Sequence, residues 1–303
     1  MAKKWNDFSR KGIPDIGPLP KLGKRTKIVA MGSCFAVEIK KALTARGYGV
    51  LPTEMSDRLS IDFAWYTPDS IEQEVLMACN PDKQIRDEGD IWHGPCKPGL
   101  LKYNYVYQDP YRRHCYENTI ADLYKRIEFQ DNMMNRSFKV AGLFIFTMGL
   151  IESWIMESGM IPCLPPNQPN KLVTTDPRKF SGKASPRLLT YEKATQCIFN
   201  IVNTIRLVLK SDAPIIFSLS PVPLGRTYRG IDISMANCIS KSTLRLAIND
   251  VVSDYSVKGV YYLPSYEIVT YIGRKAYTAD TRHILPEVVE RIVNLFMERS
   301  GAK

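Results

Sequence analysis

Ser33, Asp280 and His283 are the residues of this chain whose types and spacing suit nucleophilic chemistry. A serine hydroxyl is a weak nucleophile until a base takes its proton, and histidine does that work near neutral pH. Asp280 precedes His283 by three residues, so its carboxylate can hold Nδ1 while Nε2 faces the serine. The chain has only three histidines, and the other two lie in a long aromatic stretch. These residues predict a Ser-His-Asp triad.

Each member of this triad also has a plain structural interpretation. Ser33 can cap the helix that begins near Cys34. Asp280 can close a turn, and His283 can be an ordinary surface residue. Cys34 is a second possible nucleophile, although as the first residue of a helix it is expected to face the core. The triad is preferred because its members fall where the predicted fold would place an active site.

The elements around these residues predict a parallel α/β sheet. Short apolar runs typical of strands alternate with amphipathic helices, which implies a parallel sheet covered by helices on both faces. The expected strands are 27–32, 141–147, 213–219 and 259–263, and the expected helices are 34–46, 190–210, 237–255 and 286–298. Active sites of such sheets lie at the carboxyl ends of the strands. Ser33 directly follows the first strand, and polar motifs follow the other three.

Residues 26–303 are expected to form one domain, preceded by an extended arm at 1–25 that is rich in Pro, Gly and Lys. Two stretches interrupt the alternation of strands and helices. Residues 80–118 are rich in aromatic side chains, and residues 157–188 carry six prolines. Both are expected to be long loop insertions over the site.

The composition narrows the class of protein. The net charge of +10 would suit a nucleic-acid partner, but the basic residues are dispersed and no recognition motif accompanies them, so this alternative is disfavoured. No apolar run is long enough to span a membrane, and seven cysteines without paired spacing suit free thiols, so a cytoplasmic protein with no membrane partner is expected. No metal-ligand spacing or Gly-rich dinucleotide loop occurs, so no metal or other cofactor is predicted.

Six segments of the chain, taken in order, resemble the GSCFA-domain family from about residue 27 to residue 297. They are Gly32–Ala36, which spells Gly-Ser-Cys-Phe-Ala, then Thr147–Trp154, Ser220–Leu224, Ala236–Arg245, Leu263–Glu267 and Asp280–His283. This family belongs with the SGNH/GDSL-like hydrolases. The resemblance implies a flavodoxin-like three-layer αβα sandwich with a serine nucleophile and an Asp-x-x-His base. It further implies an esterase or O-acyltransferase acting on a small acyl group, acetyl above all, carried by a simple ester or a glycan.

The oxyanion hole is where the chain departs from SGNH-like hydrolases. Those enzymes use the serine N–H, a glycine N–H from a second block and an asparagine side chain from a third. Ala64 stands at the glycine position and keeps its N–H, whereas the segment from Gly149 to Glu152 offers no donor side chain. Losing one donor costs about 10²–10³ in rate. Asn237 or Asn104 could replace it; otherwise the enzyme is slow, or the chain is a binding module for glycans or a protein.

Two carboxylates at strand ends, Glu152 and Glu267, have two interpretations. Either one could act as a second orienting acid or accept a hydrogen bond from a substrate hydroxyl. The preferred interpretation is a structural ion pair with Lys241 or Arg245. The oligomeric state is left open.

Overall fold

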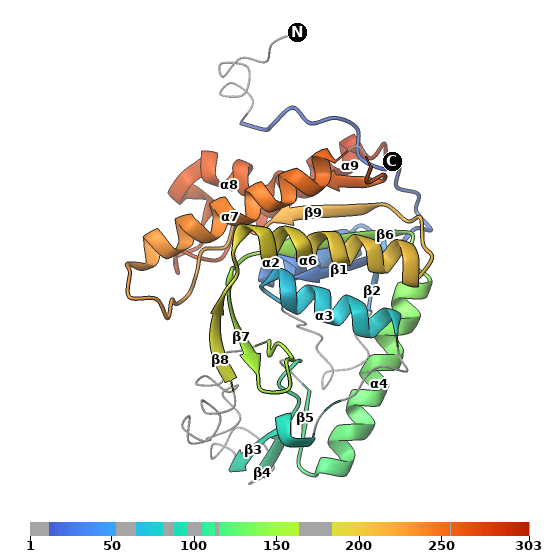
Figure 1. Cartoon of the computed structure of the whole chain (residues 1–303). Coiled ribbons are helices and arrows are strands. Elements are labelled where there is room, and N and C mark those ends of the chain that lie inside the picture. Colours follow the sequence, from blue (N-terminus) through green and yellow to red (C-terminus); the bar gives the residue numbers. More distant parts are fainter. Residues whose placement is uncertain are drawn as a thin grey trace. The chain divides into compact units, whose positions relative to one another are not determined.

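The computed structural model describes residues 12–52, 65–80, 86, 88–95, 105–112, 115–163, 184–254 and 256–302. The chain divides into two compact units (Figure 1). The first comprises Met1–Leu51, Ala141–Gly149 and Asp212–Lys303, and the second comprises Pro52–Val140 and Leu150–Ser211. Both stretches expected as insertions, 80–118 and 157–188, belong to the second unit. That residues 26–303 act as a single domain stays a prediction. None of the described helices is long and apolar enough to cross a membrane.

The first unit contains a five-stranded parallel sheet. Its strands are β1 (Lys27–Gly32), β2 (Gly49–Leu51), β6 (Leu143–Met148), β9 (Ile215–Leu219) and β10 (Val260–Tyr262), in the order β10-β9-β6-β1-β2. All neighbouring pairs run parallel. The three central strands are almost wholly buried, as expected when both faces of a sheet are covered. The predicted parallel sheet is confirmed, and only β2, which is too short to show a period, was missed.

The strand order reverses between β1 and β6. From β1 the chain turns to β2 on one side, whereas β6, β9 and β10 follow on the other side. Ligand sites of open α/β sheets lie outside the carboxyl ends of the strands at such a reversal. Gly32, the last residue of β1, pairs with Thr147 on β6 at this point. Ser33 therefore leaves the sheet where the topology favours a site.

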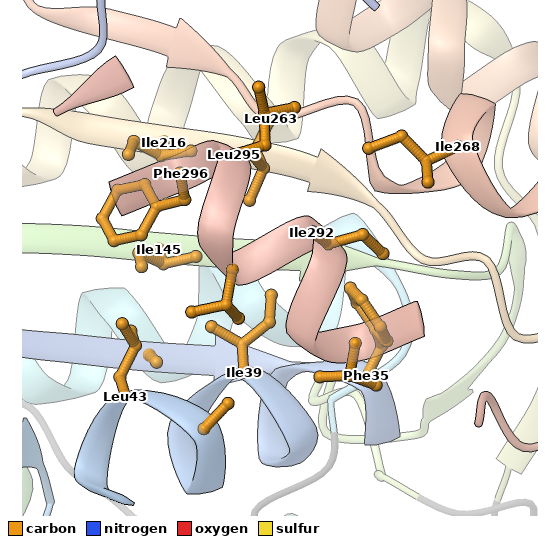
Figure 2. Packing of buried hydrophobic residues seen from close by; sticks show 14 of the residues in the cluster. Phe35, Ile39, Leu43, Ile145, Ile216, Leu263, Ile268, Ile292, Leu295 and Phe296 are labelled. Atoms are coloured by element: carbon orange, nitrogen blue, oxygen red, sulfur yellow. The ribbon is translucent and has the colours of Figure 1, made fainter. Parts of the chain in front are cut away.

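Helices cover both faces of this sheet. Helices α2 (Cys34–Ala45) and α9 (Pro286–Arg299) pack on one face, and Figure 2 shows Ile39 of α2 and Ile292 of α9 in one apolar cluster with Ile145 of β6. Helix α7 (Ile233–Ser253) contacts β9 and β10, but none of its described buried residues joins that cluster, so it covers the opposite face. Helix α8 (Ser265–Ile272) and the 3₁₀ turn η4 (Gly273–Ala276) lead from β10 toward α9. The sheet is thus the middle of three layers.

The arm before β1 is anchored on α9 by the residues nearest the sheet. Residues 12–25 form no helix or strand. The side chains of Leu19 and Leu22 are buried in the same apolar cluster as α2 and α9. The N–H of Leu19 donates to the carbonyl of Arg299 at 2.9 Å, and that of Leu22 donates to the carbonyl of Ser300 at 3.2 Å. This part of the arm therefore contributes to the core.

In its described residues, the second unit combines helices with two small antiparallel sheets. The helical elements are α3 (Pro68–Cys79), η2 (Glu88–Asp90), α4 (Ile120–Lys139), α6 (Tyr191–Asn203) and the π-helical turn η3 (Thr204–Val208). The strands are β3 (Trp92–Pro95), β4 (Tyr105–Gln108), β5 (Tyr116–Glu117), β7 (Glu152–Met156) and β8 (Ala184–Leu188), which form the sheets β3-β4-β5 and β7-β8. Helix α3 contacts both α4 and α6. The expected helix 190–210 therefore ends in a π-helical turn.

A network of buried charges lies inside the second unit. The guanidinium of Arg112 donates to both oxygens of Glu74, at 2.7 and 3.3 Å, and a third nitrogen lies 2.6 Å from Asp131. Arg86 reaches Asp109 and Asp131 at 3.4 and 3.5 Å. Burial raises the pKa of Glu74, while the Arg112 charge opposes that shift. Buried charges need such pairing, because each one alone would lose its hydration.

Candidate functional site

The site begins with a turn that brings β1 unusually close to β6. Gly32 has a φ of 132°, a backbone conformation that residues with a side chain rarely adopt. A Cβ at this position would lie 2.1 Å from the carbonyl oxygen of Thr147. Glycine is therefore required here twice, by its dihedral angle and by the neighbouring strand. The turn directs the chain from the sheet into α2.

Ser33 is held by hydrogen bonds on every side. Its N–H is shared between the carbonyl oxygen and the hydroxyl of Thr147, at 2.9 and 3.0 Å, and its own hydroxyl lies 3.0 Å from the same Thr147 hydroxyl. The Ser33 hydroxyl also accepts the N–H of Phe35 at 3.3 Å and so caps α2. The residue is only 2% exposed. The helix-capping interpretation of Ser33 is thus realised, and its N–H is already engaged rather than open to an oxyanion.

Asp280 and His283 form the expected acid–histidine pair. The Nδ1 of His283 is hydrogen-bonded to one carboxylate oxygen of Asp280, and the other oxygen accepts the N–H of His283 at 2.9 Å. That second oxygen also accepts the hydroxyl of Thr278 at 2.6 Å and the N–H of Arg282 at 2.9 Å. With Nδ1 occupied, Nε2 is the ring atom that can accept a proton. The loop therefore presents an oriented base, and the same bonds satisfy the turn interpretation of Asp280.

The Asp280–His283 loop approaches the other strand ends of the first unit. A Cβ on Gly225, in the loop after β9, would lie 2.7 Å from the guanidinium of Arg282. The charge of Arg282 also acts on the thiol of Cys34. Among the described residues, however, no hydrogen bond joins Ser33 to His283, whose side chain is 60% exposed. The structure therefore brings the loop near α2 without a direct bond to the serine.

Lys241 is a component of this region whose role the sequence did not indicate. It is 1% exposed, and its ammonium donates to the carbonyls of Gly149, Ser220 and Val222 at 2.9, 2.8 and 2.8 Å. Burial lowers the pKa of Lys241 to about 7. Each of the three N–H groups of the ammonium thus has an acceptor, and these hydrogen bonds link α7 to the residues that follow β6 and β9. The sequence could have indicated this buried position, because Lys241 lies three residues before Leu244 and so on the apolar face of the predicted helix.

Cys34 occupies the first position of α2 and is partly exposed. Burial raises the pKa of its thiol, while the positive charges of Arg282 and Lys241 and its own backbone N–H lower it. Cys34 packs against the apolar cluster shared by α2 and α9, which agrees with the expected core-facing orientation. Within the turn between β1 and α2, Cys34 is thus a residue whose side chain lies in the field of Arg282 and Lys241.

The residues expected to bind the oxyanion or the substrate do not form one group in the described structure. Gly149 is buried after β6, and its carbonyl accepts from Lys241. The side-chain oxygen of Asn237 accepts the N–H of Leu224 at 3.1 Å, so this side chain supports the loop after β9 through its oxygen. Glu152 starts β7 in the second unit. Ala64 and Asn104 lie outside the described residues.

Glu267 forms an ion pair with Arg245, as expected. Arg245 donates to one of its oxygens at 2.7 Å, and the hydroxyl of Tyr262 donates at 2.8 Å to the other. The guanidinium of Arg245 also lies over the ring of Tyr262, 4.2 Å from the ring centre. Glu267 is therefore a structural residue, and Arg245 is its partner. Lys241 binds carbonyls instead.

Comparison with known proteins supports the resemblance seen in the motifs. No curated protein matches the chain. A family model described as the GSCFA family matches residues 27–296, which begin with β1 and end within α9. The matched range contains both the Gly-Ser-Cys-Phe-Ala turn and the Asp-x-x-His loop. The chain therefore belongs to the GSCFA family.

Proposed function

We propose that this protein is an ester hydrolase or O-acyltransferase of the SGNH/GDSL-like type, acting on a small acyl group such as acetyl. The observation that carries the proposal is the Asp280–His283 pair, which is oriented by its own loop. The charge of Arg282, in the same loop, acts on Cys34 at the start of α2. An oriented imidazole at the carboxyl ends of a parallel sheet is suited to move a proton for a nucleophile. The nucleophile comes from the turn between β1 and α2, where Ser33 and Cys34 are adjacent.

The proposed reaction proceeds by covalent acyl transfer. The nucleophile attacks the ester carbonyl carbon while Nε2 of His283 takes its proton, and Asp280 holds the resulting imidazolium in place. The alcohol leaves with that proton, and water or an acceptor hydroxyl then releases the acyl group by the reverse sequence. The N-terminal end of α2 favours the negative charge that develops on the substrate oxygen.

The proposed substrate carries its acyl group on a carbohydrate. Aromatic rings suit the apolar faces of sugars. The exposed His93 and Tyr105 and the half-buried Tyr107 form an aromatic group in the second unit, with ring centres 5.4–6.1 Å apart. We place the reaction in the cytoplasm, because the described cysteines are free thiols.

Hydrolysis of p-nitrophenyl acetate by the purified protein tests the proposal. The His283→Ala variant should lose at least about 10²-fold in kcat/KM, because it lacks the general base. The control is Lys193→Ala, which removes an exposed side chain of α6 and should leave the hydrolysis of this small substrate unchanged. Equal activity of the His283→Ala variant and the wild type would contradict the proposal.

A binding module without turnover is the second candidate, favoured by the hydrogen bonds that occupy Ser33. It predicts measurable binding of acetylated oligosaccharides with no release of acetate by the wild-type protein. Calorimetry together with an acetate assay on the same samples separates the two functions. Acetate release that depends on His283 would exclude the binding-only interpretation.

A further inference from the structure

The loop that carries the acid–histidine pair also carries an arginine, Arg282, whose side chain takes no part in the bonds of that loop. Only the backbone N–H of Arg282 does so, by donating to Asp280 at 2.9 Å. The preceding residue, Thr281, has a φ of 62°, which a β-branched residue rarely adopts, and its N–H donates to the carbonyl of Thr278 at 2.9 Å. A strained backbone of this kind persists only where the surrounding bonds fix it. The loop therefore holds Arg282 in place directly before His283.

The guanidinium of Arg282 rests on Gly225, in the loop after β9. A Cβ on Gly225 would lie 2.7 Å from Nη2, 2.9 Å from Cζ and 3.0 Å from Nη1, so the whole group lies against this residue. Gly225 is not among the glycines with a positive φ, so a glycine is needed here for space rather than for its backbone conformation. The contact holds the positive charge at the carboxyl ends of the strands, where ligands of such sheets bind.

Arg282 lacks the carboxylate partner that other arginines of the first unit have. Its side chain forms no hydrogen bond or ion pair with any described residue, and it is exposed. Asp280, two residues away, is bonded by groups of its own loop instead. The paired arginines of this unit are Arg46 with Glu290, Arg245 with Glu267 and Arg299 with Asp15. The guanidinium of Arg282 is thus placed at the site with its donors open.

The loop after β9 holds a second open donor. Arg229, four residues after Gly225, has an Nη1 atom that is buried and forms no hydrogen bond within the described structure. Buried polar atoms nearly always have a partner, so a ligand or water is expected to complete this one. A guanidinium binds both oxygens of a carboxylate through paired hydrogen bonds, which makes a carboxylate the matching ligand.

We propose that Arg282 binds a carboxylate of the substrate, so that the protein acts on esters that carry a negative charge near the acyl linkage. The inference rests on the proposed function and names the substrate class of that site. Arg282 is then a residue that determines specificity, and the transfer of the acyl group proceeds as proposed above. The carboxylate can belong to the acyl group or to the alcohol, because the guanidinium would bind either one.

Two pairs of esters, each a carboxylate and its neutral methyl ester, test the inference. Mono-4-nitrophenyl adipate places the charge in the acyl group, and 4-acetoxybenzoate places it in the alcohol. The wild type should prefer the charged member of one pair by at least about tenfold in kcat/KM. Arg282→Met should abolish this preference, and Arg282→Lys should keep part of it, since an ammonium retains the charge but not the paired donors.

Gly225→Ala tests whether the position of the guanidinium matters as well as its charge. The added Cβ would displace the group, so the preference should fall although the arginine is still present. Arg274→Met, which removes another exposed arginine of the first unit, is the matched control and should keep the preference. Equal turnover of charged and neutral esters by the wild type, or a preference that survives in Arg282→Met, would overturn the inference and leave ester chemistry intact.

Modification by phenylglyoxal, an arginine reagent, gives a readout that does not depend on turnover. Adipate or 4-hydroxybenzoate should slow the modification of Arg282 several-fold, as measured by peptide mass spectrometry, whereas methyl 4-hydroxybenzoate should not. Arg274 should react at the same rate with and without these compounds. If the wild type hydrolyses none of the four esters, the proposed function fails. Modification of Arg282 that neither carboxylate slows would then overturn this inference as well.

Discussion

His283 is bonded twice to Asp280, through its backbone N–H to one carboxylate oxygen and through Nδ1 to the other. The hydroxyl of Thr278 and the N–H of Arg282 complete the set of donors. These donors, the Thr278 hydroxyl first, hold the pKa of Asp280 well below its usual range. The carboxylate therefore stays charged near neutral pH, and the imidazole is oriented before any substrate binds.

Replacing Asp280 by Asn tests this relationship. The amide can donate to Nδ1, which would leave the proton on Nε2 and remove the base. We expect kcat/KM for p-nitrophenyl acetate to fall on the order of 10²–10⁴-fold, as expected when the wrong tautomer is imposed on a catalytic histidine. The control is Asp254→Asn, since Asp254 is another aspartate that accepts the N–H and hydroxyl of a nearby serine. Comparable losses in both variants would show that the effect is not specific to His283.

Gly32→Ala tests the close approach of β1 to β6. The added Cβ would meet the Thr147 carbonyl, and the φ of 132° is unfavourable for alanine. Strain and overpacking together should lower the free energy of unfolding in urea by at least about 2 kcal/mol. Gly47→Ala separates the two effects, because Gly47 also has a positive φ, of 81°, but open space around it. If Gly32→Ala lowered the free energy of unfolding no more than Gly47→Ala does, β1 and β6 could move apart at little energetic cost.

Lys241→Met tests the buried ammonium through the pH dependence of stability. The folded protein releases this proton near pH 7, whereas the unfolded chain holds it to about pH 10.5. Between these values the unfolded state binds more protons, so the lysine makes stability rise with pH. The free energy of unfolding of the wild type minus that of the variant should therefore increase from pH 7 to pH 10.

Chemical denaturation at several pH values measures this difference. Lys193→Met, at an exposed position on α6, controls for the loss of a lysine as such. A difference that does not change with pH would mean that the three carbonyl acceptors keep the ammonium charged despite its burial.

Arg112→Met tests the charge network of the second unit. The change leaves Glu74 and Asp131 without their closest cation, and breaking a buried pair in this way costs about 3–5 kcal/mol. The loss should be smaller at low pH, because Glu74 can then bind a proton. Lys125→Met, which removes the exposed pair with Asp122, should change stability by about 1 kcal/mol or less. Equal effects of the two variants would show that burial of Arg112 contributes little.

The sequence was most informative where a local pattern decides the structure. The apolar runs at β1, β6 and β9 and the stripe of α2 predicted these elements closely, because burial on a strand or one helix face leaves a direct periodicity. The Asp280–His283 pair could be predicted for the same reason, since three residues of one loop suffice to form it. The small strands of the second unit were missed, because pairing between short irregular segments leaves no period.

The roles of Ser33, Cys34 and Lys241 depended on the tertiary structure. The sequence by itself determined the parallel sheet, the glycine turn after β1 and the acid–histidine loop. Only the folded chain showed that Thr147, over a hundred residues away, occupies the hydrogen bonds of Ser33. Only the folded chain brought Lys241 to the carbonyls of two strand ends. The physical reason is that hydrogen-bond satisfaction and desolvation depend on neighbours distant in sequence, which periodicity and spacing do not encode.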